Sequence, residues 1–234
     1  MKEVCFMNYN IEEIINDLKN TESILNDNFS CEENDIFIDS LNSEIRNKYH
    51  FDNGISKLVL IPIDENKDYV IKIPYNGCYE NGYNEESHFY EAMFCEFYGS
   101  ESSERMWDYC ASEQIRYSVA KENNLNQYLA ETKMICFIGT RPIYIQEKCT
   151  VFSQTSHKTY SLEEHKKTYS LCGDDADRIN PDWLTSFLYT YGEEEAKKFV
   201  DFIHKLDWDD DLRSDNLGFL NNKPVVIDYS GFWE

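Results

Sequence analysis

The sequence predicts an α+β fold with two lobes, in which the first lobe is built on a mainly antiparallel sheet and the second is small and helical. Two pairs of segments rich in Val and Ile are each joined by a polar or glycine-containing turn, which is typical of antiparallel hairpins. Two later segments repeat apolar residues every three or four positions, which indicates amphipathic helices. The chain has 234 residues, a length that suits one bilobed domain or two small lobes.

Composition and apolar spacing divide the chain into three parts. We expect a partly helical N-terminal extension at residues 1–50, the sheet lobe at 51–149 and the helical lobe at 150–234. In the extension, helical spacing is seen at Ile11, Ile14, Ile15 and Leu18. The extension is otherwise rich in Asn, Asp and Glu.

The strands and helices of the two lobes follow from the same patterns. The expected strands form three hairpins, 57–63 with 69–73, 133–137 with 143–146, and 217–220 with 224–227 turned at 221–222. The expected helices are 86–98, 102–128, 181–190 and 193–206. Between the sheet and the last two helices, the polar segment 150–180 is interpreted as a connector.

The charge balance restricts the partners of the protein. Lys and Arg total 22 against 44 Asp and Glu, so the formal net charge is -22. Such a surface repels phosphate backbones and anionic lipids, which argues against nucleic acid and membranes as partners. A solvated acidic surface is the simple explanation, and an acidic decoy for a basic partner surface is the alternative.

The sequence suggests neither a membrane span nor a disulfide framework. It has no run of about 18 apolar residues, and the start from Met1 to Val4 lacks the basic and apolar layout of a secretory signal. The eight cysteines form no CxxC pair and do not cluster with the five histidines at zinc-ligand spacing. We therefore expect a cytoplasmic protein whose cysteines are reduced and mostly buried.

A group of carboxylate and amide side chains flanks the final hairpin. Residues 211–216 read D-L-R-S-D-N, with Asp211 five positions before Asn216, and residues 228–231 read D-Y-S-G. This arrangement resembles the protein-kinase catalytic loop, D-x-x-x-x-N, followed by a hairpin and a DFG-like triplet. This residue pattern is similar to that of small kinase-like proteins of bacteria and their phages.

The resemblance implies a role for each residue of this group. Asp211 would accept the proton of the substrate hydroxyl, and Arg213 would face the transferred phosphate. Asn216 and Asp228 would hold Mg²⁺, which prefers oxygen ligands. ATP would be the phosphate donor, and a protein or a small molecule would be the acceptor.

The first lobe contains the lysine and the glutamate that such a site also requires. Residues 69–73 read Y-V-I-K-I and resemble the kinase V-A-I-K strand, in which alternation puts Val70 and Lys72 on one face. Glu113 interrupts the apolar stripe of the 102–128 helix. The resemblance implies that Glu113 pairs with Lys72 and holds it against the nucleotide phosphates.

Two further segments bear on nucleotide binding. Gln146, Glu147 and Lys148 match the hinge at which the backbone of a kinase would meet adenine. The loop that covers the phosphates is expected to be rich in glycine, but between residues 50 and 59 only Gly54 is available. We therefore expect a weaker backbone cradle for the phosphates than in the family pattern.

Two departures weaken the case for catalysis on peptides. Asp209 and Asp210 stand where the family places His and Arg or Gly, and their charge would repel phosphate. Only three residues follow Gly231, so we expect the peptide-binding platform of full-length kinases to be missing.

Three functions are consistent with these observations. The leading hypothesis is an ATP- and Mg²⁺-dependent kinase-like phosphotransferase, because every residue with an implied chemical role is intact. The alternatives are a pseudokinase-type binding or regulatory module and an acidic interaction protein that blocks a basic partner surface. Phe232 and Trp233 suggest apolar surface that a second copy or a host protein could cover.

Overall fold

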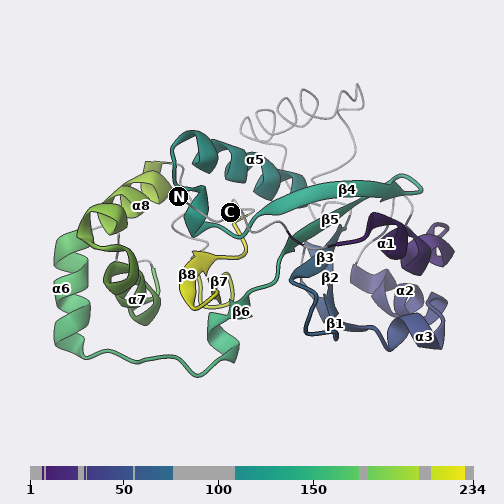
Figure 1. Ribbon diagram of the computed structural model, residues 1–234, viewed down its shortest axis with the longest axis horizontal. Helices are drawn as coiled ribbons and strands as arrows, with labels where there is room; N and C mark the ends of the chain where they lie inside the picture. Colours follow the sequence, from purple (N-terminus) through teal and green to yellow (C-terminus); the bar gives the residue numbers. More distant parts are fainter. Residues whose placement is uncertain are drawn as a thin grey trace. The chain divides into compact units, whose positions relative to one another are not determined.

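A computed structural model of the chain describes residues 7, 9–25, 29, 31–54, 56–75, 109–173, 176, 179–205 and 212–229. These residues form an α+β structure with mainly antiparallel sheets (Figure 1). The chain divides into two compact units, Met1–Ile115 with Thr132–Glu147 and Arg116–Glu131 with Lys148–Glu234. The predicted extension at residues 1–50 thus groups with the first unit, and residues 116–131 group with the second.

The first unit is built on a five-stranded antiparallel sheet with the strand order β1-β2-β3-β5-β4. Both hairpins predicted for this sheet are confirmed, and the edge strand β1 was not predicted. The strands are β1 (Tyr49–Asn53), β2 (Lys57–Pro62), β3 (Tyr69–Pro74), β4 (Thr132–Ile138) and β5 (Arg141–Glu147).

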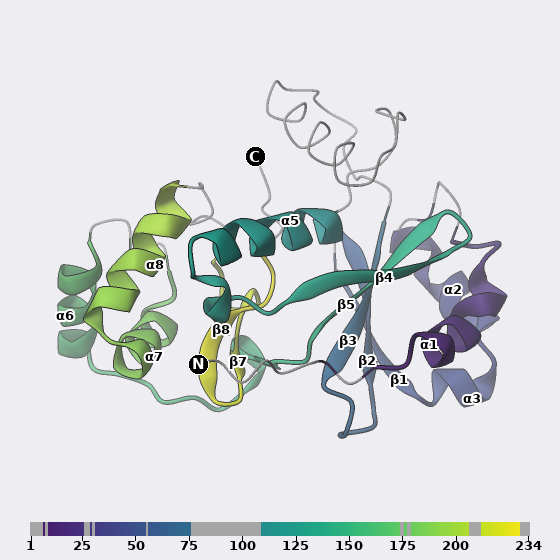
Figure 2. The same cartoon turned by 45° about the horizontal axis from the view of Figure 1, so that its top comes forward.

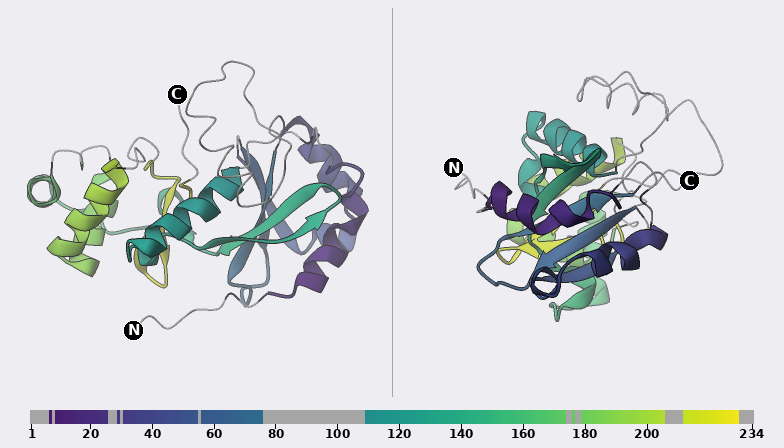
Figure 3. Two further views of the ribbon diagram at one scale, coloured as in Figure 1. Left: turned by 90° about the horizontal axis from the view of Figure 1, so that it is seen from above. Right: turned by 90° about the vertical axis from the view of Figure 1, so that its right-hand side faces the viewer.

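Three short helices, α1 (Ile11–Leu18), α2 (Asn34–Ser40) and α3 (Ser43–Arg46), pack beside this sheet (Figure 3). Helix α1 confirms the predicted helix and begins after Asn10, whose side chain caps the first turn. Ile14 and Leu18 belong to the same buried cluster as Ile71 of β3. The predicted extension therefore shares its core with the sheet.

Helix α5 (Tyr109–Glu122) begins on the opposite face of the sheet. Cys110 and Ala111 form a small buried cluster with Tyr144 of β5. Because side chains alternate along a strand, Tyr144 points away from the face to which Ile143 contributes. The first unit therefore has apolar contacts on both faces of its sheet.

Several predictions concern residues that the structure does not describe. These are the helix at 86–98, the first part of the helix at 102–128, and residues 209–211 and 231–233.

Short 3-10 helices occur at η1 (Lys19–Thr21), η2 (Cys31–Glu33) and η3 (Asn126–Tyr128).

The second unit contains the helices α6 (Leu162–Cys172), α7 (Pro181–Tyr191) and α8 (Glu193–Lys205) (Figure 2). Helices α7 and α8 confirm two predicted helices. The connector predicted at 150–180 is wrong in part, because it contains β6 (Thr150–Val151), η4 (Phe152–Gln154) and α6. Ser161 and Glu164 start α6 with a capping box. Of the helices in the described ranges, none has the length and apolar character needed to cross a membrane.

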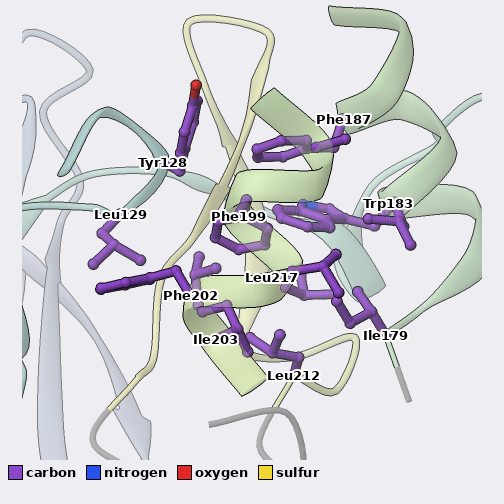
Figure 4. Close-up of a cluster of buried hydrophobic side chains, with 14 of the residues drawn as sticks. Tyr128, Leu129, Ile179, Trp183, Phe187, Phe199, Phe202, Ile203, Leu212 and Leu217 are labelled. Carbon is purple, nitrogen blue, oxygen red and sulfur yellow. The ribbon is translucent and has the colours of Figure 1, made fainter. Parts of the chain in front are cut away.

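An aromatic cluster forms the core of the second unit (Figure 4). The rings of Phe187 and Phe199 stack with centroids 4.7 Å apart, and Tyr128 lies edge-on to Phe187 at 4.9 Å. The indole N–H of the buried Trp183 donates to the backbone oxygen of Gly218 at 3.2 Å. Full burial of one large apolar side chain stabilises a fold by about 1.5–3 kcal/mol, so this cluster contributes strongly to stability.

The final hairpin joins β7 (Leu217–Leu220) to β8 (Lys223–Val226), and β7 also pairs with β6. The predicted turn is confirmed: Asn221 and Asn222 have φ of 52° and 61°, which asparagine tolerates in two-residue turns. Glycine is required at position 218, because a Cβ there would lie 2.8 Å from the backbone oxygen of Thr150. The hairpin is thus held closely against β6.

Candidate functional site

A buried carboxylate bound by two lysines lies on the α5 side of the first sheet. Lys72 Nζ donates to both carboxylate oxygens of Glu113, at 2.9 Å to Oε1 and 2.8 Å to Oε2. Lys57 Nζ of β2 donates to Glu113 Oε1 at 2.7 Å. Glu113 is 0% exposed and each lysine 3%. The predicted pairing of Lys72 with Glu113 is therefore present, and a second lysine joins it.

Two neutral side chains add to the hydrogen bonding around Glu113. Thr132 Oγ1 donates to Glu113 Oε2 at 2.7 Å. Gln146 Nε2 donates to the same oxygen at 3.3 Å and to Thr132 Oγ1 at 2.8 Å. Such hydrogen bonds offset the lost hydration of a buried carboxylate. Glu113, Lys57, Lys72, Thr132 and Gln146 are called the Glu113 cluster below.

The strand register explains why these side chains meet. Lys72 lies opposite Val59 of β2, and Lys57 is two residues before Val59, so both lysines project from one face. Gln146 lies opposite Thr132 in the same way. Lys57 was not predicted as a site residue, because only the register between β2 and β3 brings it beside Lys72.

The charges of the Glu113 cluster are unfavourable to bury. Two positive unit charges about 5 Å apart repel each other by about 3 kcal/mol at an effective dielectric constant of about 20. The two lysines share Oε1 of Glu113, and attraction to the carboxylate offsets this repulsion only when the geometry is good. Charged groups gathered in this way are frequent at functional sites.

The residues predicted to meet adenine lie at the end of β5. Gln146 pairs with Val70 of β3, and its side chain belongs to the Glu113 cluster. Glu147 is the last residue of β5 and pairs with Tyr69. Lys148 is the next residue and the first of its segment in the second unit. The predicted hinge therefore coincides with a boundary between the two units.

In the second unit, the two predicted magnesium ligands are neighbours. The backbone oxygen of Asn216 accepts hydrogen bonds from the N–H of Ile227 at 2.8 Å and of Asp228 at 3.3 Å. Asn216 is buried, and Asp228 is partly buried. Arg213 is exposed, and its backbone oxygen accepts a hydrogen bond from Asn216 N–H at 2.9 Å. The hairpin thus brings residues 216 and 228 together at its open end.

Two side chains of the second unit hold the segment that follows Asp228. Arg116 Nη1 donates to the backbone oxygen of Tyr229 at 2.5 Å. The Tyr229 hydroxyl donates to the backbone oxygen of Ala130 at 2.6 Å. Both side chains are buried. Neither was predicted from the sequence, where the only signal was the position of Tyr229 beside Asp228.

The metal-binding capacity of the described residues is limited. Asp211, the predicted catalytic base, lies outside the described residues. Within the described ranges, no group of three or more His, Cys, Asp and Glu side chains is arranged to hold a metal ion. Asn216 and Asp228 offer an amide oxygen and a carboxylate, a donor set that suits Mg²⁺ when waters and phosphate oxygens supply the other ligands.

Two described thiols are poorly suited to covalent catalysis. Burial raises the pKa of Cys172 to about 11, and it also raises the pKa of Cys136. Because the thiolate is the reactive form of cysteine, neither side chain is a good nucleophile at neutral pH.

Comparison with known proteins does not assign the chain to a family. No protein-family model matches the sequence, and neither a curated protein nor a solved structure matches the chain. A function is therefore inferred from the site residues and their geometry.

Proposed function

We propose that the protein has a kinase-like bilobed fold and is an ATP- and Mg²⁺-dependent phosphotransferase, with a protein or a small molecule as acceptor. The observation that carries this assignment is the buried ion pair between Lys72 of β3 and Glu113 of α5, with distances of 2.8 and 2.9 Å. A strand lysine oriented by a helix glutamate is the arrangement that positions an ammonium group on nucleotide phosphates.

The other residues of the motif have complementary roles in phosphoryl transfer. Lys72 binds the phosphates of ATP while Glu113 holds its ammonium group. Asp211 accepts the proton of the acceptor hydroxyl as the hydroxyl oxygen attacks the γ-phosphorus. The bond from the γ-phosphorus to the β–γ bridging oxygen breaks, and ADP leaves with that electron pair. Arg213 faces the phosphate that is transferred.

Asn216 and Asp228 fit the metal ion that this reaction requires. Both are oxygen donors, and the hydrogen bond from Asp228 N–H to the Asn216 backbone oxygen supports their adjacency. When bound, Mg²⁺ neutralises charge on the phosphate oxygens. Asn216 and Asp228, on either side of the hairpin, would hold the Mg²⁺ ion.

Nucleotide binding can be tested by thermal unfolding. Millimolar ATP with Mg²⁺ is expected to raise Tm, because a ligand that binds only the native state stabilises it. Lys72→Ala should lose most of this shift. A wild-type Tm that does not change with ATP and Mg²⁺ would contradict the assignment.

Phosphoryl transfer needs a separate test with radiolabelled ATP. Asp211→Asn should lower the rate of transfer by about 10²–10⁴-fold, because the acceptor hydroxyl loses its general base. The same variant should keep the thermal shift with ATP. Asp215→Asn, an exposed change in the same loop, is the matched control and should keep both activities.

A pseudokinase-type module is the second candidate, and the turn between β1 and β2 favours it. Gly54 is the only glycine between residues 50 and 59, so this turn is poor in glycine for a phosphate-covering loop. If ATP raises the Tm but no phosphoryl group is transferred, either to the protein itself or to added acceptors, the results would support this candidate.

A further inference from the structure

The Glu113 cluster contains two lysines around one carboxylate. Lys57 and Lys72 both donate to Oε1 of Glu113, at 2.7 and 2.9 Å. Their Nζ atoms are therefore no farther apart than the sum of these two distances. Like charges held this close are unfavourable for folding. We propose that Lys57 is a second phosphate-binding residue, which acts with Lys72 on adjacent phosphoryl groups of a nucleoside triphosphate. This inference rests on the proposed function.

The turn before Lys57 gives an independent reason for this role. Phosphate-covering loops bind phosphate oxygens with backbone N–H groups, most often of glycines. Here the N–H of Gly54 donates to the backbone oxygen of Lys57 at 3.0 Å. That N–H is used to close the turn, so it does not face a phosphate. The ammonium group of Lys57, on the strand that follows the turn, supplies positive charge in its place.

The placement of the two lysines is compatible with a polyphosphate. They come from neighbouring strands, and the register makes them diagonal neighbours on one face. A lysine ammonium is a compact point charge with three donors, so one donor can turn to a phosphate oxygen while another stays on Glu113. Two such groups can therefore contact two consecutive phosphoryl groups.

Affinity for Mg²⁺-ATP, measured by isothermal titration calorimetry, tests the role of Lys57. Lys57→Met should weaken binding by about tenfold or more, the usual effect of losing a hydrogen bond between charged groups. Lys57→Arg, which keeps the charge, should stay close to wild type. Lys67→Met is the matched control: it removes the same charge from the turn between β2 and β3, where Lys67 binds Glu13 at 2.9 Å. This control should bind Mg²⁺-ATP as wild type does.

The possible outcomes separate this inference from the proposed function. If wild type binds Mg²⁺-ATP and Lys57→Met binds it equally well, Lys57 has no phosphate role and the proposed function stands. If Lys57→Met and Lys57→Arg are weakened equally, Lys57 supports the site by packing and the inference is overturned. If wild type binds no Mg²⁺-ATP, the proposed function fails and the inference fails with it.

Discussion

Glu113 connects four strands of the first sheet through one carboxylate. Its partners are Lys57 of β2, Lys72 of β3, Thr132 of β4 and Gln146 of β5. A buried ion pair contributes little net stability by itself, but removing one partner leaves the other charges without their counterpart. The stability of this sheet therefore depends on a residue that lies in a helix.

Neutralising this carboxylate should destabilise the protein. Glu113→Gln keeps the size of the side chain and removes its charge, so we expect the free energy of unfolding to fall by about 3 kcal/mol or more. Urea denaturation followed by circular dichroism measures this change. Glu12→Gln, an exposed position in α1, is the control and should change stability little. A loss below about 1 kcal/mol for Glu113→Gln would show that the cluster is not buried as described.

The hydrogen bond from Tyr128 to Glu195 makes stability depend on pH. The hydroxyl donates to Glu195 Oε2 at 2.6 Å. This bond, with help from Lys198, lowers the pKa of Glu195 below 4.5, so its contribution is present above pH 4.5 and is lost as pH falls. Burial, together with the same bond, raises the pKa of Tyr128 from 10.0 to about 12, so its contribution is lost as pH rises through that range.

Tyr128→Phe should therefore alter the pH profile on both sides. At neutral pH we expect the variant to be less stable by about 1 kcal/mol, because the hydrogen bond is lost. The difference should shrink below pH 4.5 and above pH 10, as one partner or the other changes protonation. Urea denaturation at three pH values measures it. A difference that is constant with pH would mean that packing, and not this bond, explains the effect.

At the scale of elements, the contact between β6 and β7 limits which residue can occupy position 218. A Cβ on Gly218 would lie 2.8 Å from Thr150 O and 3.0 Å from Ile227 Cγ2. Backbone atoms cannot yield as the end of a long side chain can. The hairpin between Asn216 and Asp228 must therefore shift if any larger residue is introduced.

Gly218→Ala should destabilise the second unit by about 1–3 kcal/mol, the usual cost of overpacking. Urea denaturation followed by tryptophan fluorescence is a direct measurement, because Trp183 donates to the backbone oxygen of Gly218. Asn222→Gly lies in the exposed turn of the same hairpin, where glycine adopts a φ of 61° without strain. This control should unfold at a urea concentration close to that of wild type. If Gly218→Ala were as stable as wild type, that result would contradict the close contact.

Elements with local signals could be predicted from the sequence, and elements defined by distant partners could not. The turn at Asn221 and Asn222 has its own chemistry, and so does the start of α7 at Pro181. Strand β1 is poor in Val and Ile, and it is a strand because β2 pairs with it. Helix α6 is different, since its capping box at Ser161 and Glu164 is a local signal of a helix start.

The same distinction applies to the candidate site. Lys72 and Glu113 could be predicted because each lies in a recognisable pattern on its own element. Lys57 depends on the register between β2 and β3, and Arg116 on a contact with Tyr229 far along the chain. Contacts of this kind follow from tertiary packing, which periodicity within a segment does not specify.

At the scale of the whole molecule, the net charge of -22 opposes compaction. Salt screens this repulsion over a Debye length of about 10 Å at 0.1 M and about 3 Å at 1 M. We therefore expect Tm to rise by several degrees when NaCl is increased from about 0.05 M to about 0.5 M. Differential scanning calorimetry measures this shift.

A matched measurement near pH 4.5, the isoelectric point of the sequence, is the control for this effect. There the net charge is small, so added salt should change Tm much less. If salt lowers Tm at neutral pH, the attractive ion pairs such as Lys48 with Asp17 outweigh the general repulsion.

The sharing of one carboxylate by two lysines also has a consequence for how this sequence can change over time. Substitutions at positions 57, 72 and 113 are coupled, because residues in one network of contacts do not act additively. Loss of Glu113 leaves two buried cations, whereas prior loss of one lysine makes that step less harmful. The order in which substitutions arise therefore decides whether the intermediate sequences fold. Lineages that lose this site should therefore lose one lysine before they lose the glutamate.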